Sequence, residues 1–174
     1  MIVARHAQSV WNLHFGRDRV DPGIPDAPLT ELGHAQALDL ARRLAEQDVR
    51  RVVASPYTRT LQTASIVGRT LDVPVAIEPL VRERNAFSCD QGSSPEALVG
   101  AWPDLVFDGL AADWFGTPIE TLEQLRERCG AFARKAASWA DFEHVAVISH
   151  WGFIRGLTGQ EITNAGFVRL ARPI

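Results

Sequence analysis

The chain has 174 residues, of which 46% are hydrophobic and 22% are charged, and its formal net charge is −3. These values are typical of one globular domain with a sizeable core, so we treat residues 1–174 as a single domain. They do not favour a nucleic-acid partner, because the longest basic runs are the pairs Arg42-Arg43 and Arg50-Arg51.

The two cysteines, Cys89 and Cys129, lie far apart and form neither a metal-ligand spacing nor a disulfide framework. Free thiols fit a reducing compartment, so we expect a cytoplasmic protein. The apolar run before Arg5 is too short for a signal-peptide core, and no run approaches the roughly 18 residues of a membrane span. We therefore expect no leader, no metal and no membrane partner.

Short apolar runs alternate along the chain with longer runs of helical spacing. We predict, in order, a strand at 2–4, a helix from Ser9, a helix at 30–47 with Thr30 as N-cap, a strand at 51–55, a helix at 57–71, a strand at 73–78, a helix at 121–139, a strand at 144–149, a short helix, and a last strand at 167–170. The expected buried positions of the three long helices are Ala37, Leu40, Ala41, Leu44; Leu61, Ala64, Val67, Leu71; and Leu122, Leu125, Cys129, Phe132, Ala136.

Strands that alternate with helices indicate an α/β fold. We expect a three-layer α/β/α sandwich with a mostly parallel central sheet. Residues 84–120 break the alternation with several glycines and prolines. We interpret them as a lid insertion over one end of the sheet.

Polar and charged residues follow the predicted strands where each strand ends. Arg5 and His6 follow the first strand, and a loop leads from the second strand to Arg59. Glu83 follows the third strand and His150 follows the fourth. Ligands of parallel sheets bind beyond the carboxyl ends of the strands, so we expect these groups to meet in one site.

Two histidines and two arginines around one point form an anion pocket suited to phosphate. Neutral imidazole can attack phosphorus and form a covalent intermediate that water hydrolyses. The arginines would lower the pKa of the histidine and stabilise the transferring phosphoryl charge. Glu83 is placed to protonate the leaving alkoxide, but a surface salt bridge with Arg82 or Arg84 is an equally good interpretation.

Ser9 and Asn12 belong to the predicted turn into the first helix. The amides of that helix start would add donors and a dipole to the anion pocket. Ser9 is also a good helix N-cap, and capping is compatible with ligand contact.

Five segments carry a family resemblance. They are "RHAQSVWN" (5–12), "DAPLTELGHAQALDLARRL" (26–44), "ASPYTRTLQTA" (54–64), "RER" (82–84) and "VISHWGFIRGL" (147–157). In this order they resemble the signature segments of the histidine phosphatase superfamily, phosphoglycerate mutase-like branch. They span nearly the whole chain.

The resemblance implies a role for each matching position. His6 would be the nucleophile that becomes phosphohistidine, and Glu83 the proton donor. Arg5, Arg59 and His150 would surround the phosphoryl group. Ser9 and Asn12 would lie in the substrate pocket with Arg5 and Arg59. The family needs no metal and no cofactor. The other histidines, His14, His34 and His144, match no catalytic position, although His14 could line the pocket mouth.

Two positions depart from the family pattern, because Ala7 and Trp151 each stand where the family has glycine. A positive φ at either position would cost of order 1 kcal/mol of backbone strain. Trp151 would either pack against the lid or shape the substrate pocket.

We expect a metal-independent histidine acid phosphatase-like phosphatase that acts on a small-molecule phosphomonoester. Phosphoglycerate mutase-type phosphoryl transfer and a phosphate-binding regulatory protein with little turnover are the alternatives. A mutase must hold a second anionic group, which calls for positive charge in the lid. The predicted lid is instead acidic, so we favour a neutral or apolar leaving group; its carboxylates are Glu96, Asp104, Asp108, Asp113 and Glu120.

Overall fold

The computed structural model describes residues 1–116 and 119–172. Five strands form one sheet in the order β3-β2-β4-β1-β5. Their bounds are β1 (Ile2–Arg5), β2 (Arg51–Ala54), β3 (Val75–Ile77), β4 (Val145–Ser149) and β5 (Phe167–Arg169). The first four strands pair in parallel, and β5 pairs with β1 in the antiparallel direction at one edge. The predicted mostly parallel sheet is confirmed.

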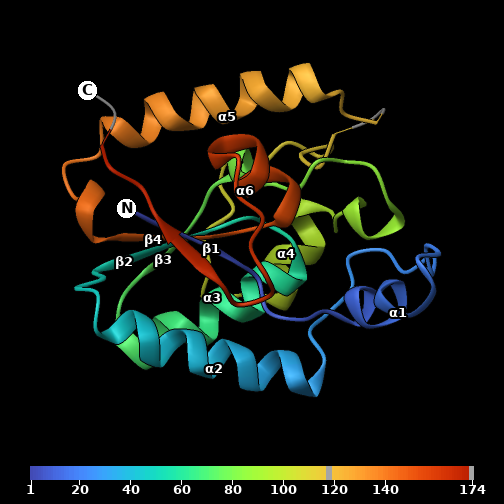
Figure 1. Cartoon of the computed structure of the whole chain (residues 1–174), viewed down its shortest axis with the longest axis horizontal. Helices are drawn as coiled ribbons and strands as arrows, with labels where there is room; N and C mark the ends of the chain where they lie inside the picture. The colour runs from blue at the N-terminus through green and yellow to red at the C-terminus, as the bar shows by residue number, and fades with distance from the viewer. Residues whose placement is uncertain (117–118, 173–174) are drawn as a thin grey trace.

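Helices lie on both sides of this sheet (Figure 1), with α5 and α6 on one side and α2 and α3 on the other. The bounds are α1 (Val10–Asp18), α2 (Glu31–Ala45), α3 (Thr58–Leu71), α4 (Pro95–Ala101), α5 (Leu122–Ala137) and α6 (Trp151–Thr158). Three short 3₁₀ helices are η1 (Pro79–Val81), η2 (Ser88–Asp90) and η3 (Phe142–His144). This is the predicted three-layer sandwich.

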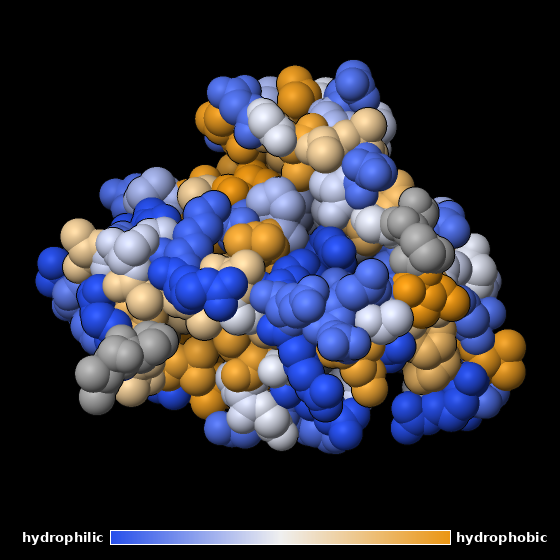
Figure 2. Space-filling view, turned by 90° about the horizontal axis from the view of Figure 1, so that it is seen from above, coloured by the Kyte–Doolittle hydropathy of each residue, from blue (hydrophilic) through white to orange (hydrophobic). Residues whose placement is uncertain are grey.

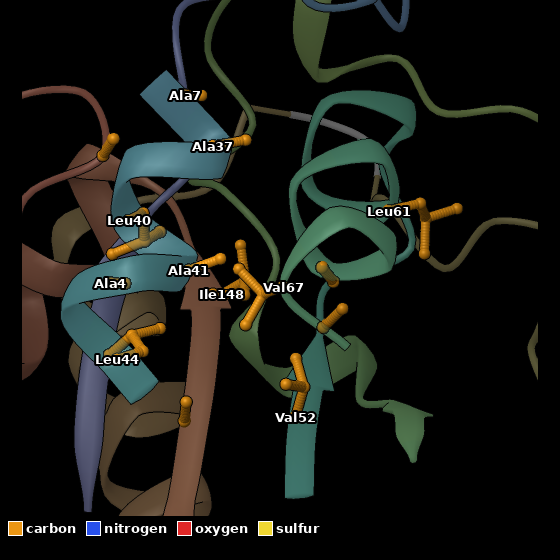
Figure 3. Close-up of a cluster of buried hydrophobic side chains, with 14 of the residues drawn as sticks. Ala4, Ala7, Ala37, Leu40, Ala41, Leu44, Val52, Leu61, Val67 and Ile148 are labelled. Carbon is orange, nitrogen blue, oxygen red and sulfur yellow. The ribbon is translucent and has the colours of Figure 1, made fainter. Parts of the chain in front are cut away.

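Side chains of the central strands alternate between the two helical layers, as the period of two in a strand requires. In β1, Ile2 and Ala4 pack with the α2 and α3 side chains, whereas Val3 packs with those of α5 and α6. Figure 3 shows part of the first cluster, in which side chains of α2 and α3, among them Ala41 and Val67, gather over the strands around Ile148 of β4. The short β strands are thus held by burial on both faces.

The predicted buried faces of α2 and α5 are largely confirmed. The N-cap of α2 is Thr30, whose hydroxyl accepts the Gly33 amide at 2.9 Å. Leu122 was wrongly predicted to point inward: it is the first residue of α5 and is 55% exposed. Leu71, at the end of α3, is only partly buried against the core.

The segment 84–120 has two structural roles. Leu98, Phe107 and Trp114 are buried in the cluster on the α2 and α3 side, so this part extends the core. The Trp114 ring meets the Tyr57 ring edge-on with a centroid separation of 4.6 Å. Arg84, Ala86, Phe87, Cys89 and Asp90 line the cavity described below, and the lid function itself stays a prediction.

Hydrophilic and hydrophobic residues are interspersed in small groups over the face in Figure 2. In the described part of the chain, no helix has both the length and the apolarity needed to cross a membrane.

Candidate active site

A cavity of about 500 Å³ lies at the carboxyl edge of the sheet. The predicted convergence of strand ends is therefore found. Arg5 and His6 reach it from the end of β1, Arg59 from the first turn of α3, and Glu83 from the loop after η1. His150 follows β4, and its ring centroid lies 5.2 Å from that of His6.

His6 is held in one orientation by its backbone surroundings. It is 3% exposed, and its amide donates to the Ser149 carbonyl at 2.9 Å. Its Nδ1 lies 2.7 Å from the carbonyl oxygen of Ala7. Because a carbonyl only accepts, Nδ1 carries the proton and Nε2 keeps its lone pair. His6 is thus in the tautomer that a nucleophile at Nε2 needs.

Burial lowers the pKa of His6 well below its usual range, and the charges of Arg59 and Arg5 lower it further. Burial likewise lowers the pKa of His150, with Arg59 and His6 adding to the effect. Both imidazoles are therefore neutral near pH 7. Like-charge repulsion from the arginines was expected, and the structure adds that desolvation is the larger cause.

Two buried nitrogen atoms in this group have no hydrogen-bond partner among the described residues: Arg5 Nε and His150 Nδ1. Arg5 Nη1 donates to the Ile162 carbonyl at 3.1 Å, and His150 Nε2 lies 2.9 Å from Ser55 Oγ. Unpartnered buried polar groups are uncommon, because each loses its hydration without compensation. These two atoms suit the oxygens of an anion.

Glu83 is not in a surface ion pair. In the described part of the chain its carboxylate accepts three backbone amides, those of Arg84 at 2.8 Å and of Gly152 and Phe153 at 3.1 Å each. Arg82, a predicted alternative partner, pairs instead with Glu120 at 3.3 Å. The carboxylate of Glu83 therefore faces the cavity from a fixed position at the start of α6.

Burial raises the pKa of Glu83 above its usual value, and the negative charge of Asp90 raises it further. The amides of Gly152 and Arg84 act in the opposite direction, since they stabilise the ionised form. The net rise is what a proton donor needs at a pH where ordinary carboxyls are ionised.

Ser9 and Asn12 have a clear structural role. Ser9 caps α1 by accepting the Asn12 amide at 3.2 Å, and Asn12 Oδ1 accepts the Ser9 amide at 3.1 Å. Asn164 Nδ2 also donates to Asn12 Oδ1 at 3.1 Å. Ser9 and Asn12 both line the cavity, so the capping interpretation is confirmed and contact with a ligand stays a prediction.

The two departures from the family glycines cause no strain, because neither Ala7 nor Trp151 has a positive φ. Ala7 is fully buried in the core, and Trp151 is 36% exposed at the first turn of α6 and lines the cavity. Arg155 lies over the Trp151 ring at 5.1 Å. The glycine that the site does require is Gly152, where a Cβ would lie 2.5 Å from Glu83 Oε1.

The acidic-lid expectation is wrong in its geometry. Among the described residues, those that line the cavity do not include Glu96, Asp104, Asp108, Asp113 or Glu120. Glu120 is buried between Arg82 and Arg128. Glu96 is exposed in the first turn of α4, and Asp104, Asp108 and Asp113 are exposed in turns. Sequence order placed them in the segment, but only the tertiary structure decides which side chains face inward.

Several lining residues were missed by the sequence argument. Arg19 adds positive charge to that of Arg84, which the sequence did place at this edge, and Asp90 and Glu161 add negative charge. An aromatic wall is formed by Trp11, Phe15 and Phe87, whose ring centroids lie 4.4–5.4 Å apart. The spacing of Trp11 and Phe15 on a helix could have indicated part of this wall, whereas no pattern in a loop marks Phe87 or Asp90.

The remaining histidines lie outside the cavity. His14 and His34 are exposed, so the suggestion that His14 lines the pocket mouth is wrong. His144 Nδ1 lies 3.0 Å from an Asp48 carboxylate oxygen at the opposite end of the sheet. Within residues 1–116 and 119–172, no group of three or more His, Cys, Asp or Glu side chains is arranged to hold a metal ion.

The sequence profile of the histidine phosphatase superfamily (branch 1) matches residues 1–168. The chain belongs to this superfamily. A curated relative, "Probable phosphoglycerate mutase GpmB" of Yersinia enterocolitica, is 34% identical over 85 residues, which cover 49% of this chain and 38% of that protein. The chain thus matches well under half the length of this relative.

Solved structures share the fold. A mycobacterial glucosyl-3-phosphoglycerate phosphatase in complex with VO3 has a TM-score of 0.67 at 21% identity, covering 96% of this chain and 88% of that one. A phosphoserine phosphatase mutant from Entamoeba histolytica, in complex with phosphoserine, has a TM-score of 0.65 at 18% identity, covering 95% and 87%.

Proposed function

We propose that this chain is a metal-independent phosphomonoesterase that works through a phosphohistidine on His6. The observation that carries the proposal is the orientation of His6, whose Nδ1 proton is held by the Ala7 carbonyl. Its Nε2 lone pair is then free in a cavity that also holds Arg5, Arg59 and Glu83.

In the first step, His6 Nε2 forms a bond to phosphorus while the ester P–O bond breaks. Glu83 gives its proton to the departing alkoxide, which leaves as a neutral alcohol. In the second step, Glu83 takes a proton from water, whose oxygen attacks phosphorus and breaks the P–N bond. Arg5, Arg59 and His150 are proposed to bind the phosphoryl oxygens in both steps.

The aromatic wall supports a leaving group that is neutral and at least partly apolar. Phe87 is 44% exposed and lines the cavity beside Trp11 and Phe15, so a planar or apolar group could bury area against it. Phe87→Ala should raise KM for an aryl phosphate several-fold while leaving that for methyl phosphate unchanged. Val106→Ala, which removes an exposed side chain that does not line the cavity, is the matched control.

Mutase-type phosphoryl transfer is the second candidate. It is favoured by the similarity to the Yersinia protein and by Arg19 and Arg84 at the cavity, which could hold a second anionic group. Hydrolysis of a panel of sugar phosphates, nucleotides, aryl phosphates and phosphopeptides should be compared with conversion of 3-phosphoglycerate to its isomer. Faster isomerisation than hydrolysis would replace the phosphatase proposal.

Rapid quenching with a ³²P-labelled substrate tests the covalent step. Acid-labile, base-stable label should appear on the wild-type chain and be lost in His6→Ala. A regulatory protein with little turnover would instead bind phosphate without becoming labelled.

The proposed partner is a small-molecule phosphomonoester. The proposed compartment is the cytoplasm, and the two free, buried thiols of Cys89 and Cys129 support it.

A further inference from the structure

Asp90 is a buried carboxylate of the cavity that the reaction proposed above does not use. It is 1% exposed at the end of η2, and no sequence motif marks it. Its Oδ1 lies 3.2 Å from Arg59 Nη2, and its Oδ2 accepts the amides of Ala86 at 3.1 Å and Phe87 at 3.0 Å. A carboxylate beside the proposed phosphate site would repel the negatively charged substrate, so its presence there requires a functional explanation.

Asp90 and its neighbour fix the guanidinium of Arg59. Nη1 of Arg59 donates to the Cys89 carbonyl at 2.7 Å, and Nη2 donates to Asp90. The guanidinium also lies over the Tyr57 ring, 4.4 Å from its centroid, and Tyr57 in turn donates its hydroxyl to the Asp90 carbonyl at 2.8 Å. These contacts use two of the five guanidinium N–H groups, which leaves three for a ligand.

The negative charge of Asp90 also acts on Glu83, which lines the same cavity. Two carboxylates in one desolvated site disfavour double ionisation. Burial raises the pKa of both carboxyls, but only Asp90 has a charged partner within hydrogen-bond distance, Arg59, whereas the described contacts of the Glu83 carboxylate are backbone amides. The proton of the pair therefore resides on Glu83.

We propose that Asp90 is a positioning residue that fixes Arg59 for the phosphoryl group and, through its charge, keeps the proton on Glu83 until the leaving group takes it. This inference rests on the function proposed above. The negative charge of Asp90 also repels inorganic phosphate, which favours the release of this product after hydrolysis.

The pKa of Glu83 agrees with this arrangement, because the raising effect of Asp90 exceeds the lowering effect of Arg59. Other titratable or charged groups face Glu83 from each surrounding element. They are Arg5 after β1, Tyr57 and Arg59 around the start of α3, Cys89 in η2 and Cys129 of α5. Arg82 and Arg128 donate to the backbone carbonyl of Glu83, and the Arg84 amide donates to its carboxylate. His6 lines the same cavity, and the His150 ring lies beside that of His6.

The experiment uses Asp90→Asn, with Asp108→Asn as a control at an exposed carboxylate outside the cavity. ¹³C NMR titration of the Glu83 carboxyl should show a lower pKa in Asp90→Asn. Hydrolysis of an alkyl phosphate at pH 8 should fall roughly tenfold, and its alkaline limb should move to lower pH, while an activated aryl phosphate loses less than about threefold. Vanadate should bind more tightly, because the amide oxygen of the new side chain can still accept from Arg59 Nη2 and hold it in place, while the negative charge that repels the anion is gone.

A purely structural role for Asp90 predicts the opposite pattern: weaker vanadate binding and an unmoved Glu83 titration. That result overturns the proposal. If Asp90→Asn does not fold, ¹³C NMR titration of both carboxyls in the wild-type chain gives the answer: Asp90 should lose its proton at a lower pH than Glu83, and the reverse order overturns the proposal. The NMR and vanadate measurements need no turnover, so they test Asp90 even where labelling of His6 shows the phosphatase proposal to be wrong.

Discussion

The Gly152 amide donates to Glu83 Oε2 at 3.1 Å, and a Cβ on Gly152 would lie 2.5 Å from Oε1 of the same carboxylate. The Glu83 carboxylate, the proposed acid, therefore occupies the space that a side chain at Gly152 would need. The amide of Phe153 joins in at 3.1 Å, so the free donors of the first helical turn orient the carboxylate.

Gly152→Ala should displace the Glu83 carboxylate while the fold survives, because the atom in the way is the end of a flexible side chain. We expect hydrolysis of alkyl phosphates to fall about a hundredfold, within the range that general acid catalysis contributes. The free energy of unfolding should change by less than about 1 kcal/mol. Gly100→Ala, in α4 with open space around it, is the control and should keep full activity.

Ala7→Gly tests whether the family glycine is needed at this position. Ala7 is fully buried without a positive φ, so glycine would only remove a packed methyl group and add freedom to the unfolded chain. We expect a loss of about 1 kcal/mol in the free energy of unfolding, with kcat kept within about threefold. The control is Asp72→Gly, at an exposed position with φ of 55°, which should not lower the free energy of unfolding in this way. Urea denaturation measures both variants, and an equal loss of stability in the two would contradict the prediction.

Glu83→Gln removes the proton but keeps the size and the amide contacts of the side chain. Hydrolysis of an alkyl phosphate should fall about 10²- to 10⁴-fold, since its leaving group needs the proton. An activated aryl phosphate, whose leaving group departs as an anion, should lose far less. Equal losses of hydrolysis rate on both substrates would show that Glu83 is not the acid. Glu123→Gln removes a carboxylate at an exposed position on α5 and is the control for the change in charge alone.

The two neutral histidines make stability depend on pH. The pKa values of His6 and His150 are lowered in the folded state, so below about pH 6.5 the unfolded chain binds protons that the native chain does not. Stability should therefore fall as the pH drops from 7 to 5, by up to about 1.4 kcal/mol per pH unit for each proton.

Glu83 and Asp90 act in the opposite direction, because their pKa values are raised in the folded state. Their contribution is present at low pH and is lost as the pH rises above the values of the unfolded chain. Urea denaturation from pH 7 to 5 should show a smaller slope in His6→Gln and in His150→Gln than in the wild type. Slopes that match the wild type in both variants would rule out the histidines as the cause.

The sequence by itself determined the layers of the fold and the polar ends of its strands. The spacing of Leu40, Ala41 and Leu44 predicts a helix with one buried face, and these residues are fully buried. The residues that follow the strands predict one site. Arg5, His6, Arg59 and Glu83 do line one cavity, and the buried His150 ring lies beside that of His6. Local periodicity carries this information, because strands and helices repeat on a scale of a few residues.

Only the tertiary structure decided what surrounds these groups. It placed Asp90 against Arg59, turned Glu120 away between two arginines, and made Gly152, and not residue 151, the position that must lack a side chain. Each of these three features depends on how a loop packs against an element far away in the sequence. The residues next to each position show no periodic pattern that would predict such packing. The pKa of Glu83 depends on how far the surrounding charged groups lie from its carboxyl in space. Their separation along the sequence does not predict that distance.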